Sequence, residues 1–287
     1  MKILPLAADS LGVRSMATMV TGGGVSLLID PGAALGGLER NDAVPSDAER
    51  QAAAAARARI ITAASRCDAV FVTSYGPDHH NLLADCRATL PVFLKTPSDA
   101  GEYSAARAII DVIKGPGRSI GFAGGSETAF GALTVGCSAG LSAMAVTVRS
   151  EGRTFVHGSS SLNRDCDAGL RHVIGQAPDL VYLSGAPLYR LGEDNRDSDG
   201  EPPIRGACRK ALRALLELVG RSGCRAVVDH ELLRTMDYRQ LYAPAFATGR
   251  VSTAAEFLNS KETLLEAARM SERGALAARG GQVTAAA

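Results

Sequence analysis

The sequence predicts an α/β protein of the α+β type: a four-layer αββα sandwich in which two mixed β-sheets pack between outer layers of helices. Two observations support this fold class. Short apolar runs and helix-like runs follow one another in the order strands, helices, strands, helices. No internal repeat or linker-like composition divides the 287 residues. We therefore expect one domain over residues 1–273, followed by a disordered Ala/Gly tail over residues 274–287.

The first half of the chain is expected to supply one sheet and the helices that cover it. Gly22–Gly24 suits a hairpin turn, because glycine accepts positive φ at little cost. Ser46 and Glu49 form a capping box at the start of an alanine-rich run, which predicts a helix. Periodicity places the elements of this half as strands at 2–7, 25–30, 69–73 and 91–94, and helices from 46 to about 65 and from about 98 to 114.

The second half is expected to supply the other sheet and its helices. Thr253 and Glu256 form a second capping box, which predicts a helix running to about Arg273. The segment Leu191–Pro203 is too polar to pack and is expected to be a surface loop, which leaves open whether it acts as a lid or contacts a partner. The other elements are strands at 119–122, 132–135, 143–148, 154–157, 179–184 and 225–229, and helices at 170–176 and 208–219.

Composition excludes several classes of partner. The 31 basic and 30 acidic residues give a net charge of +1, which favours neither nucleic acid nor anionic membranes. No apolar run reaches the ~20 residues of a membrane span, and the N-terminus does not resemble a signal peptide. The 6 cysteines lack CxxC spacing and are expected to be reduced thiols. We expect a cytoplasmic protein with a small-molecule substrate, and leave open a homo-oligomer or a paralogue partner.

Asp78, His79 and His80 offer a carboxylate and two imidazoles in consecutive positions, in a chain with only 5 histidines. They follow the apolar run at 69–73, so we expect them in a loop at the exit of a buried strand. A rigid scaffold commonly holds functional side chains at such exits. Gly76-Pro77-Asp78 is also ordinary turn chemistry, so this stretch by itself leaves both a metal site and a polar turn open.

Further segments, spread in order over almost the whole chain, carry a family resemblance: SLGVRSMAT at 10–18, LIDPG at 28–32, Asp78–His80, Asp229–Arg234 and TAAEFL at 253–258. Together they resemble the metallo-β-lactamase-fold superfamily, and within it a mainly archaeal family of predicted metal-dependent hydrolases. The resemblance implies the αββα fold of the metallo-β-lactamase type and an active site descended from one that holds two metal ions.

The resemblance also implies that part of the metal motif is lost. The first ligand block of the superfamily, His-x-His-x-Asp-His, places its two leading histidines at Ser74 and Gly76. The bridging aspartate falls at Ser160. The third histidine has no counterpart in a region that contains Cys137 and Ser138. The ligands of one metal ion are therefore absent.

Asp78, His79 and His230 match the ligands of the second metal, so the resemblance implies a reduced, mononuclear site for one divalent ion, zinc or iron. A set of two imidazoles and one carboxylate leaves positions open for water or substrate. Glu231, His80 or Cys137 could add a ligand or act as the general base. Our candidate catalytic residues are Asp78, His80 and Glu231.

Two functions remain open from the sequence. The first is a mononuclear metal enzyme that acts on a small molecule by metal-assisted hydrolysis or by iron-dependent oxidation. The second is a metal-free pseudoenzyme that serves as a binding or scaffolding partner, in which Asp78, His79 and His230 bond to one another and to the backbone. Binding of an ion requires the strand exits near residues 78 and 230 to converge in space.

Overall fold

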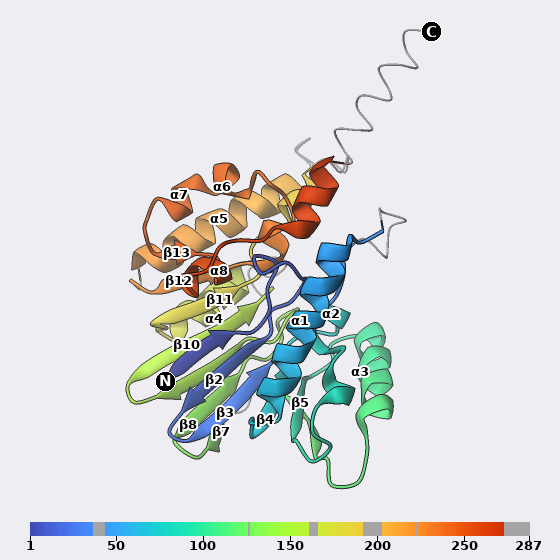
Figure 1. The fold of residues 1–287 in the computed structure, drawn as a ribbon. Coiled ribbons are helices and arrows are strands. Elements are labelled where there is room, and N and C mark those ends of the chain that lie inside the picture. The colour runs from blue at the N-terminus through green and yellow to red at the C-terminus, as the bar shows by residue number, and fades with distance from the viewer. Residues whose placement is uncertain (37–43, 126, 161–165, 192–202, 222, 273–287) are drawn as a thin grey trace.

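The computed structural model describes residues 1–36, 44–125, 127–160, 166–191, 203–221 and 223–272. Its strands form two sheets, which Figure 1 shows with helices around them. The six-stranded sheet runs in the order β1 (Lys2–Pro5), β2 (Thr18–Gly22), β3 (Val25–Ile29), β4 (Ala69–Val72), β5 (Val92–Lys95) and β6 (Ile120–Ala123). The seven-stranded sheet runs in the order β13 (Val251–Ser252), β12 (Arg225–Val228), β11 (Leu180–Leu183), β10 (Arg153–Ser159), β9 (Val146–Ser150), β8 (Leu133–Cys137) and β7 (Glu127–Phe130).

The helices fall into longer ones, which cover the sheets, and single turns, which mostly follow strands. The longer ones are α1 (Asp47–Ala64), α3 (Ala100–Ile113), α4 (Cys166–Gly175) and α5 (Pro203–Arg221). The short ones are α2 (Pro77–His80), α6 (Tyr238–Leu241), α7 (Ala243–Phe246), α8 (Ala254–Phe257) and the 3₁₀ turns η1 (Leu83–Asp85), η2 (Leu188–Arg190) and η3 (His230–Leu233).

Strand direction is mixed in both sheets, as predicted. β1, β2 and β3 are antiparallel neighbours, whereas β3, β4, β5 and β6 run parallel. In the other sheet β7 to β10 are antiparallel and β10 to β13 parallel. Gly23 and Gly24, with φ of 55° and 79°, close the β2–β3 hairpin. Because β3 and β4 are parallel, the residues that follow them meet at one edge of the sheet.

The side chains of each strand alternate between a central layer and an outer layer. Leu27 and Ile29 of β3 belong to the central cluster with Phe155 of β10 and Tyr182 of β11, so the two sheets pack directly against each other. Leu28, between the two β3 residues, joins the cluster that α1 and α3 cover. This alternation places one layer of helices outside each sheet and confirms the αββα sandwich.

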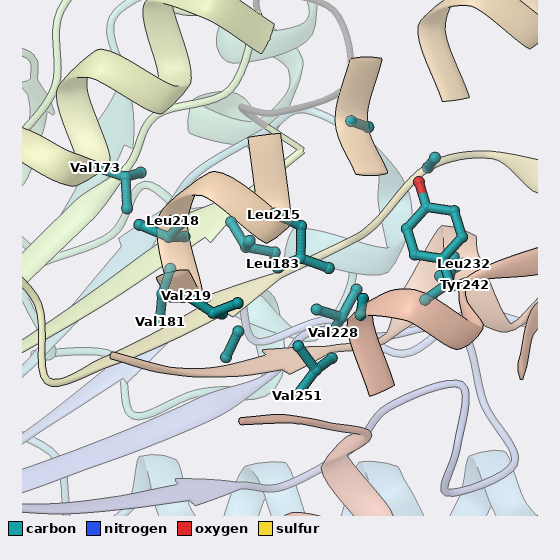
Figure 2. Packing of buried hydrophobic residues seen from close by; sticks show 14 of the residues in the cluster. Val173, Val181, Leu183, Leu215, Leu218, Val219, Val228, Leu232, Tyr242 and Val251 are labelled. Carbon is teal, nitrogen blue, oxygen red and sulfur yellow. The ribbon is translucent and has the colours of Figure 1, made fainter. Parts of the chain in front are cut away.

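The second outer layer lies over the seven-stranded sheet. Val181 and Leu183 of β11 pack against Leu215 and Leu218 of α5, as Figure 2 shows for the labelled members of this cluster. These β11 residues flank Tyr182, which faces the central layer. One strand therefore serves two hydrophobic cores.

The capping box at α1 forms as the sequence predicts. The Ser46 hydroxyl accepts from the Glu49 backbone N–H at 3.2 Å, and the Glu49 carboxylate accepts from the Ser46 N–H at 2.7 Å. Together these bonds satisfy N–H groups that helix geometry leaves without an intrahelical partner. Behind this cap Ile60 is fully buried against the six-stranded sheet, so the alanine-rich run has one apolar face.

Here the structure corrects one predicted helix and adds a strand that the sequence did not predict. The helix predicted from Thr253 to about Arg273 is wrong: α8 ends at Phe257, and Asn259 has a φ of 53°, which an α-helix does not allow. The next helical stretch covers 265–272, after Thr263 has donated its N–H to the Ser10 carbonyl at 2.8 Å. The strand β7 was not predicted, because its residues are mostly exposed at a sheet edge.

Two predicted segments fall on residues outside those described. These are the tail at 274–287 and most of the polar loop between Leu191 and Pro203, where 192–202 are excluded. Among the described residues, no helix combines the length and the apolar character needed to cross a membrane.

Candidate metal centre

The three predicted ligands follow two strands, one from each sheet. β4 ends at Val72, and Asp78 and His79 lie on α2, a single helical turn that Pro77 opens. This turn of helix corrects the loop expected at these positions. β12 ends at Val228, and the Asp229 carboxylate accepts from the His230 N–H at 2.8 Å as η3 begins. Both sets of ligands are thus held by short helical turns on buried strands.

Asp78, His79 and His230 converge in space. His230 Nε2 lies 3.0 Å from Asp78 Oδ2, and His79 Nε2 lies 4.0 Å from Asp78 Oδ1. The centroids of the two imidazole rings are 5.8 Å apart. One potential ligand atom from each residue lies within 4.8 Å of the others. The donor set, two imidazoles and one carboxylate, therefore fits a single divalent ion.

Each imidazole is held from behind by its own buried carboxylate. His230 Nδ1–H donates to Asp9 Oδ2 at 2.8 Å, and His79 Nδ1–H donates to Asp30 Oδ2 at 2.9 Å. Both contacts leave Nε2 directed at Asp78. Histidines that bind metals commonly donate their other ring N–H to a carboxylate in this way, which fixes the tautomer and the orientation of the ring.

Asp30 is the more completely enclosed of these two carboxylates, with no exposed surface. Besides His79 it binds Thr73, from the backbone N–H at 2.7 Å and from the hydroxyl at 2.6 Å. Its φ is 51°, and that of His230 is 61°. Left-handed backbone at a non-glycine residue costs of order 1–3 kcal/mol and is often found at functional sites.

Gly32 allows the turn after β3 to approach α2 closely. A Cβ at this position would lie 2.4 Å from the Asp78 carbonyl carbon and 2.6 Å from the His79 nitrogen. No side chain fits between these backbones. The glycine of the LIDPG segment therefore sets the position of the helical turn that carries two predicted ligands.

The segments that carry the family resemblance meet beside this site. The Asp229 carboxylate accepts from the N–H groups of Ser10 at 3.0 Å and Ala254 at 2.9 Å. The Ser10 hydroxyl in turn accepts from the Ala255 N–H at 2.9 Å. Burial, with the nearby charge of Asp9, raises the pKa of Asp229 to about 6. Segments from both ends of the sequence thus fix the position of His230.

The ligand set forms a coupled ionic cluster. Burial and the charge of Arg234 lower the pKa of His230, but the charge of Asp9 and the bonds to Asp78 and Asp9 outweigh them and raise it to about 10. Burial also opposes a charge on His79, yet Asp30 and Asp78 raise its pKa above the ordinary value. Burial would raise the pKa of Asp78, but His79, His230 and Arg234 hold it well below its usual range.

A cavity of about 290 Å³ opens in front of the three ligands. Ser74, Gly76 and Ser160, the positions assigned to lost ligands, line it together with Asp78, His79 and His230. The lost and the kept positions of the motif therefore face the same space. Among the described residues, Tyr75, Glu102, Ser142, Glu231 and Arg234 also line it.

The other three candidate residues, Glu231, His80 and Cys137, differ in their position relative to the cavity. Glu231 lines the cavity, and its Oε2 accepts from the Ser184 hydroxyl at 3.4 Å. His80 is not among the described residues that line the cavity; its Nε2–H donates to the Tyr75 carbonyl at 3.1 Å. Cys137 lies in the central core, where burial raises the pKa of its thiol to about 12. The geometry therefore brings Glu231 to the ligands, but neither His80 nor Cys137.

Sequence reasoning did not assign roles to Asp9, Asp30 or Arg234. One signal could have identified Asp30: it follows β3, which runs parallel to β4, and the carboxyl ends of parallel strands meet at one sheet edge. Asp9 is 221 residues from His230 in the sequence, so no local pattern links the two. Arg234 belongs to the segment Asp229–Arg234, whose family resemblance marks no role for this residue.

Comparison with known proteins assigns the family. No protein-family model matches the chain. A UPF0282 protein of Methanopyrus kandleri is 30% identical over 94% of this chain and 98% of its own length. The chain belongs to the UPF0282 family. UPF0282 proteins of Methanocaldococcus jannaschii and Saccharolobus solfataricus are 28% and 27% identical, each over 94% of this chain and over 95% and 92% of their own lengths.

Solved structures show that this UPF0282 protein has the metallo-β-lactamase fold. An isothiocyanate hydrolase from Delia radicum gut bacteria matches with a TM-score of 0.53 and 13% identity, over 88% of this chain and 95% of that one. Zinc-bound PqqB from Methylobacterium extorquens matches with a TM-score of 0.52 and 14% identity, over 88% and 98%. A possible metal-dependent hydrolase from Veillonella parvula matches with a TM-score of 0.53 and 14% identity, over 84% and 94%.

Proposed function

We propose that this UPF0282 protein is a mononuclear metal enzyme that acts on a small molecule, with hydrolysis as the favoured reaction. The observation that carries the proposal is the pair of buried carboxylates, Asp9 and Asp30, which orient His230 and His79 toward Asp78. The names of two solved structures with the same fold, an isothiocyanate hydrolase and a possible metal-dependent hydrolase, support hydrolysis. Iron-dependent oxidation remains the alternative reaction for this donor set.

In the proposed site each residue has a separate role: metal ligand, orienting carboxylate or general base. Asp78, His79 and His230 hold the ion, zinc or iron, and Asp9 and Asp30 orient the imidazoles. A bound ion supplies Lewis acidity and lowers the pKa of a water molecule on it. Glu231 lines the cavity beside the ligands and is the candidate general base. The cavity of about 290 Å³ supports a small molecule as the substrate.

The stoichiometry of bound metal tests the proposal. Protein purified without chelator, or loaded with zinc or ferrous iron and desalted, is expected to carry close to one equivalent by elemental analysis. A second equivalent is not expected, because Ser74, Gly76 and Ser160 stand where further ligands would be needed. Absence of metal under every loading condition would exclude the enzyme hypothesis, and two equivalents would exclude a mononuclear site.

Ion affinity is expected to rise with pH. The charge of Asp9 and the bonds to Asp78 and Asp9 raise the pKa of His230 to about 10, so this ring carries at neutral pH a proton that the ion must displace, and the raised pKa of His79 acts in the same direction. Each displaced proton makes the apparent affinity rise about 10-fold per pH unit below the pKa of that group. Titration calorimetry at several pH values, in buffers of different ionisation enthalpy, measures the protons released. An affinity independent of pH would contradict this prediction.

The charge balance of the ion-free site supports a second candidate, the metal-free pseudoenzyme. With both rings protonated, His79, His230 and Arg234 neutralise Asp9, Asp30 and Asp78, and His230 bonds directly to Asp78 at 3.0 Å. In such a cluster each carboxylate has a cationic partner without an ion. The loading experiment separates the two candidates, because a pseudoenzyme of this kind takes up no metal at micromolar concentration.

A further inference from the structure

We propose that the cavity binds a small anionic group, a carboxylate or phosphate, and that Arg234 is the residue that selects it. The inference rests on the proposed function, because the anion site is formed jointly by Arg234 and an ion held by Asp78, His79 and His230. It extends that function to the chemical class of the ligand.

Arg234 lies at the boundary between the ligand set and the cavity. It lines the cavity, yet its side chain is only 8% exposed. Nη2 lies 3.1 Å from His230 Nε2 and 3.5 Å from Asp78 Oδ2, and the guanidinium packs 5.6 Å from the centre of the Tyr189 ring. The planar group is thus held in place on several sides.

The contacts of Arg234 change when an ion occupies the site. His230 Nε2 and an Asp78 oxygen are ligand atoms in the proposed site, and atoms that hold an ion are poor acceptors for a guanidinium. Nε keeps only a long contact of 3.4 Å to Asp9, and among the described residues Nη1 makes no hydrogen bond. A guanidinium with N–H donors directed into a cavity, next to a second cation, favours an anion there.

The charges are arranged with the positive side toward the cavity. Asp9 and Asp30 lie behind the imidazoles and are not among the described lining residues. Of the carboxylates on the wall, Glu102 is paired with Lys95. The ion and Arg234 together place more positive charge on the wall than Asp78 and Glu231 offset. Arginine pairs with planar carboxylates and with phosphates through two parallel hydrogen bonds, which favours those groups over a single-point anion.

Binding of simple probes to metal-loaded protein tests this inference. Acetate and inorganic phosphate are titrated into protein carrying one equivalent of cobalt(II), and the visible spectrum of the bound ion reports occupancy. Acetamide, a neutral molecule of almost the same shape as acetate, serves as the control ligand. Wild-type protein is expected to bind acetate or phosphate at least tenfold more tightly than acetamide, and comparison of the two anions identifies the preferred group.

Substitutions of Arg234 separate its role from that of the ion. Arg234→Gln is expected to lower the affinity for the anion at least tenfold while one equivalent of metal still binds, whereas Arg234→Lys retains part of the affinity. Arg213→Gln, an exposed arginine on α5, is the matched control and should change nothing. Thermal unfolding of each variant shows whether the fold is kept.

The outcomes distinguish failure of the proposed function from failure of the anion-binding inference. Protein that takes up no ion refutes the proposed function and this inference with it. Protein that takes up one ion but binds acetate and phosphate no better than acetamide refutes the inference alone. The same conclusion follows if Arg234→Gln binds one ion and holds the anion as tightly as wild type does.

Discussion

Replacing His79 or His230 with alanine is expected to abolish stoichiometric metal binding. Each offers one of the three potential ligand atoms that lie within 4.8 Å of one another, and two remaining ligands would hold a divalent ion poorly. The loss should exceed the roughly 10–100-fold that removal of an outer-sphere partner costs. Elemental analysis after desalting, together with competition against a chromophoric chelator, measures it.

His172→Ala is the control for these variants, because His172 lies on α4 in the outer layer and is not among the ligands. Its metal content should equal that of the wild type. His79→Gln and His230→Gln keep much of the side-chain volume, so they separate loss of a ligand from loss of packing. Full metal content in a folded His79→Ala or His230→Ala protein would rule out the assigned ligand set.

Replacing Asp30 with alanine is expected to have the largest effect on stability. The substitution removes the acceptor for the Thr73 N–H, the Thr73 hydroxyl and His79 Nδ1–H, all in a fully buried position. Breaking a buried pair by removing one partner costs about 3–5 kcal/mol, because the other group is left uncompensated. Urea unfolding followed by circular dichroism measures the change in the free energy of unfolding.

Asp30→Asn and Asp111→Ala complete this experiment. Asparagine keeps an acceptor for Thr73 but removes the charge behind His79, so metal affinity should fall by about 10–100-fold with a smaller loss of stability. Asp111 near the end of α3 forms an exposed pair with Lys114, and its replacement should leave the free energy of unfolding close to that of the wild type. Equal losses at Asp30 and Asp111 would show that the buried carboxylate has no structural role.

Local sequence patterns were sufficient to predict those elements that depend on residues close together in the sequence. The capping box at Ser46 and Glu49 and the strand at 69–72 appear where apolar periodicity and capping chemistry place them. The polar edge strand β7 was missed because exposed residues carry no hydrophobic alternation. The helix after Thr253 was predicted too long because its interruption at Asn259 depends on Thr263 pairing with Ser10, 253 residues earlier in the chain.

The candidate site likewise contains residues that the sequence identifies and residues that only the structure identifies. Asp78, His79 and His230 could be named because residue type and family resemblance mark them, and the structure brings them together. The carboxylates that orient the two histidines are harder to predict from the sequence. Asp9, for example, contacts His230 only because the two sheets pack together. The position of His80, turned toward the Tyr75 carbonyl, follows from the single helical turn of α2, where the sequence predicts a loop.

The pairing of Asp9 with His230 has a consequence for how the protein matures in the cell. The ribosome releases Asp9, Asp30, Asp78 and His79 long before residue 230 has been synthesised, so the first sheet emerges with an incomplete coordination sphere. A cation cannot meet its full set of ligands until most of the polypeptide has left the exit tunnel. In the proposed metal enzyme, metal insertion would therefore be a late event in biogenesis, and a truncated translation product ending before His230 should emerge as apoprotein.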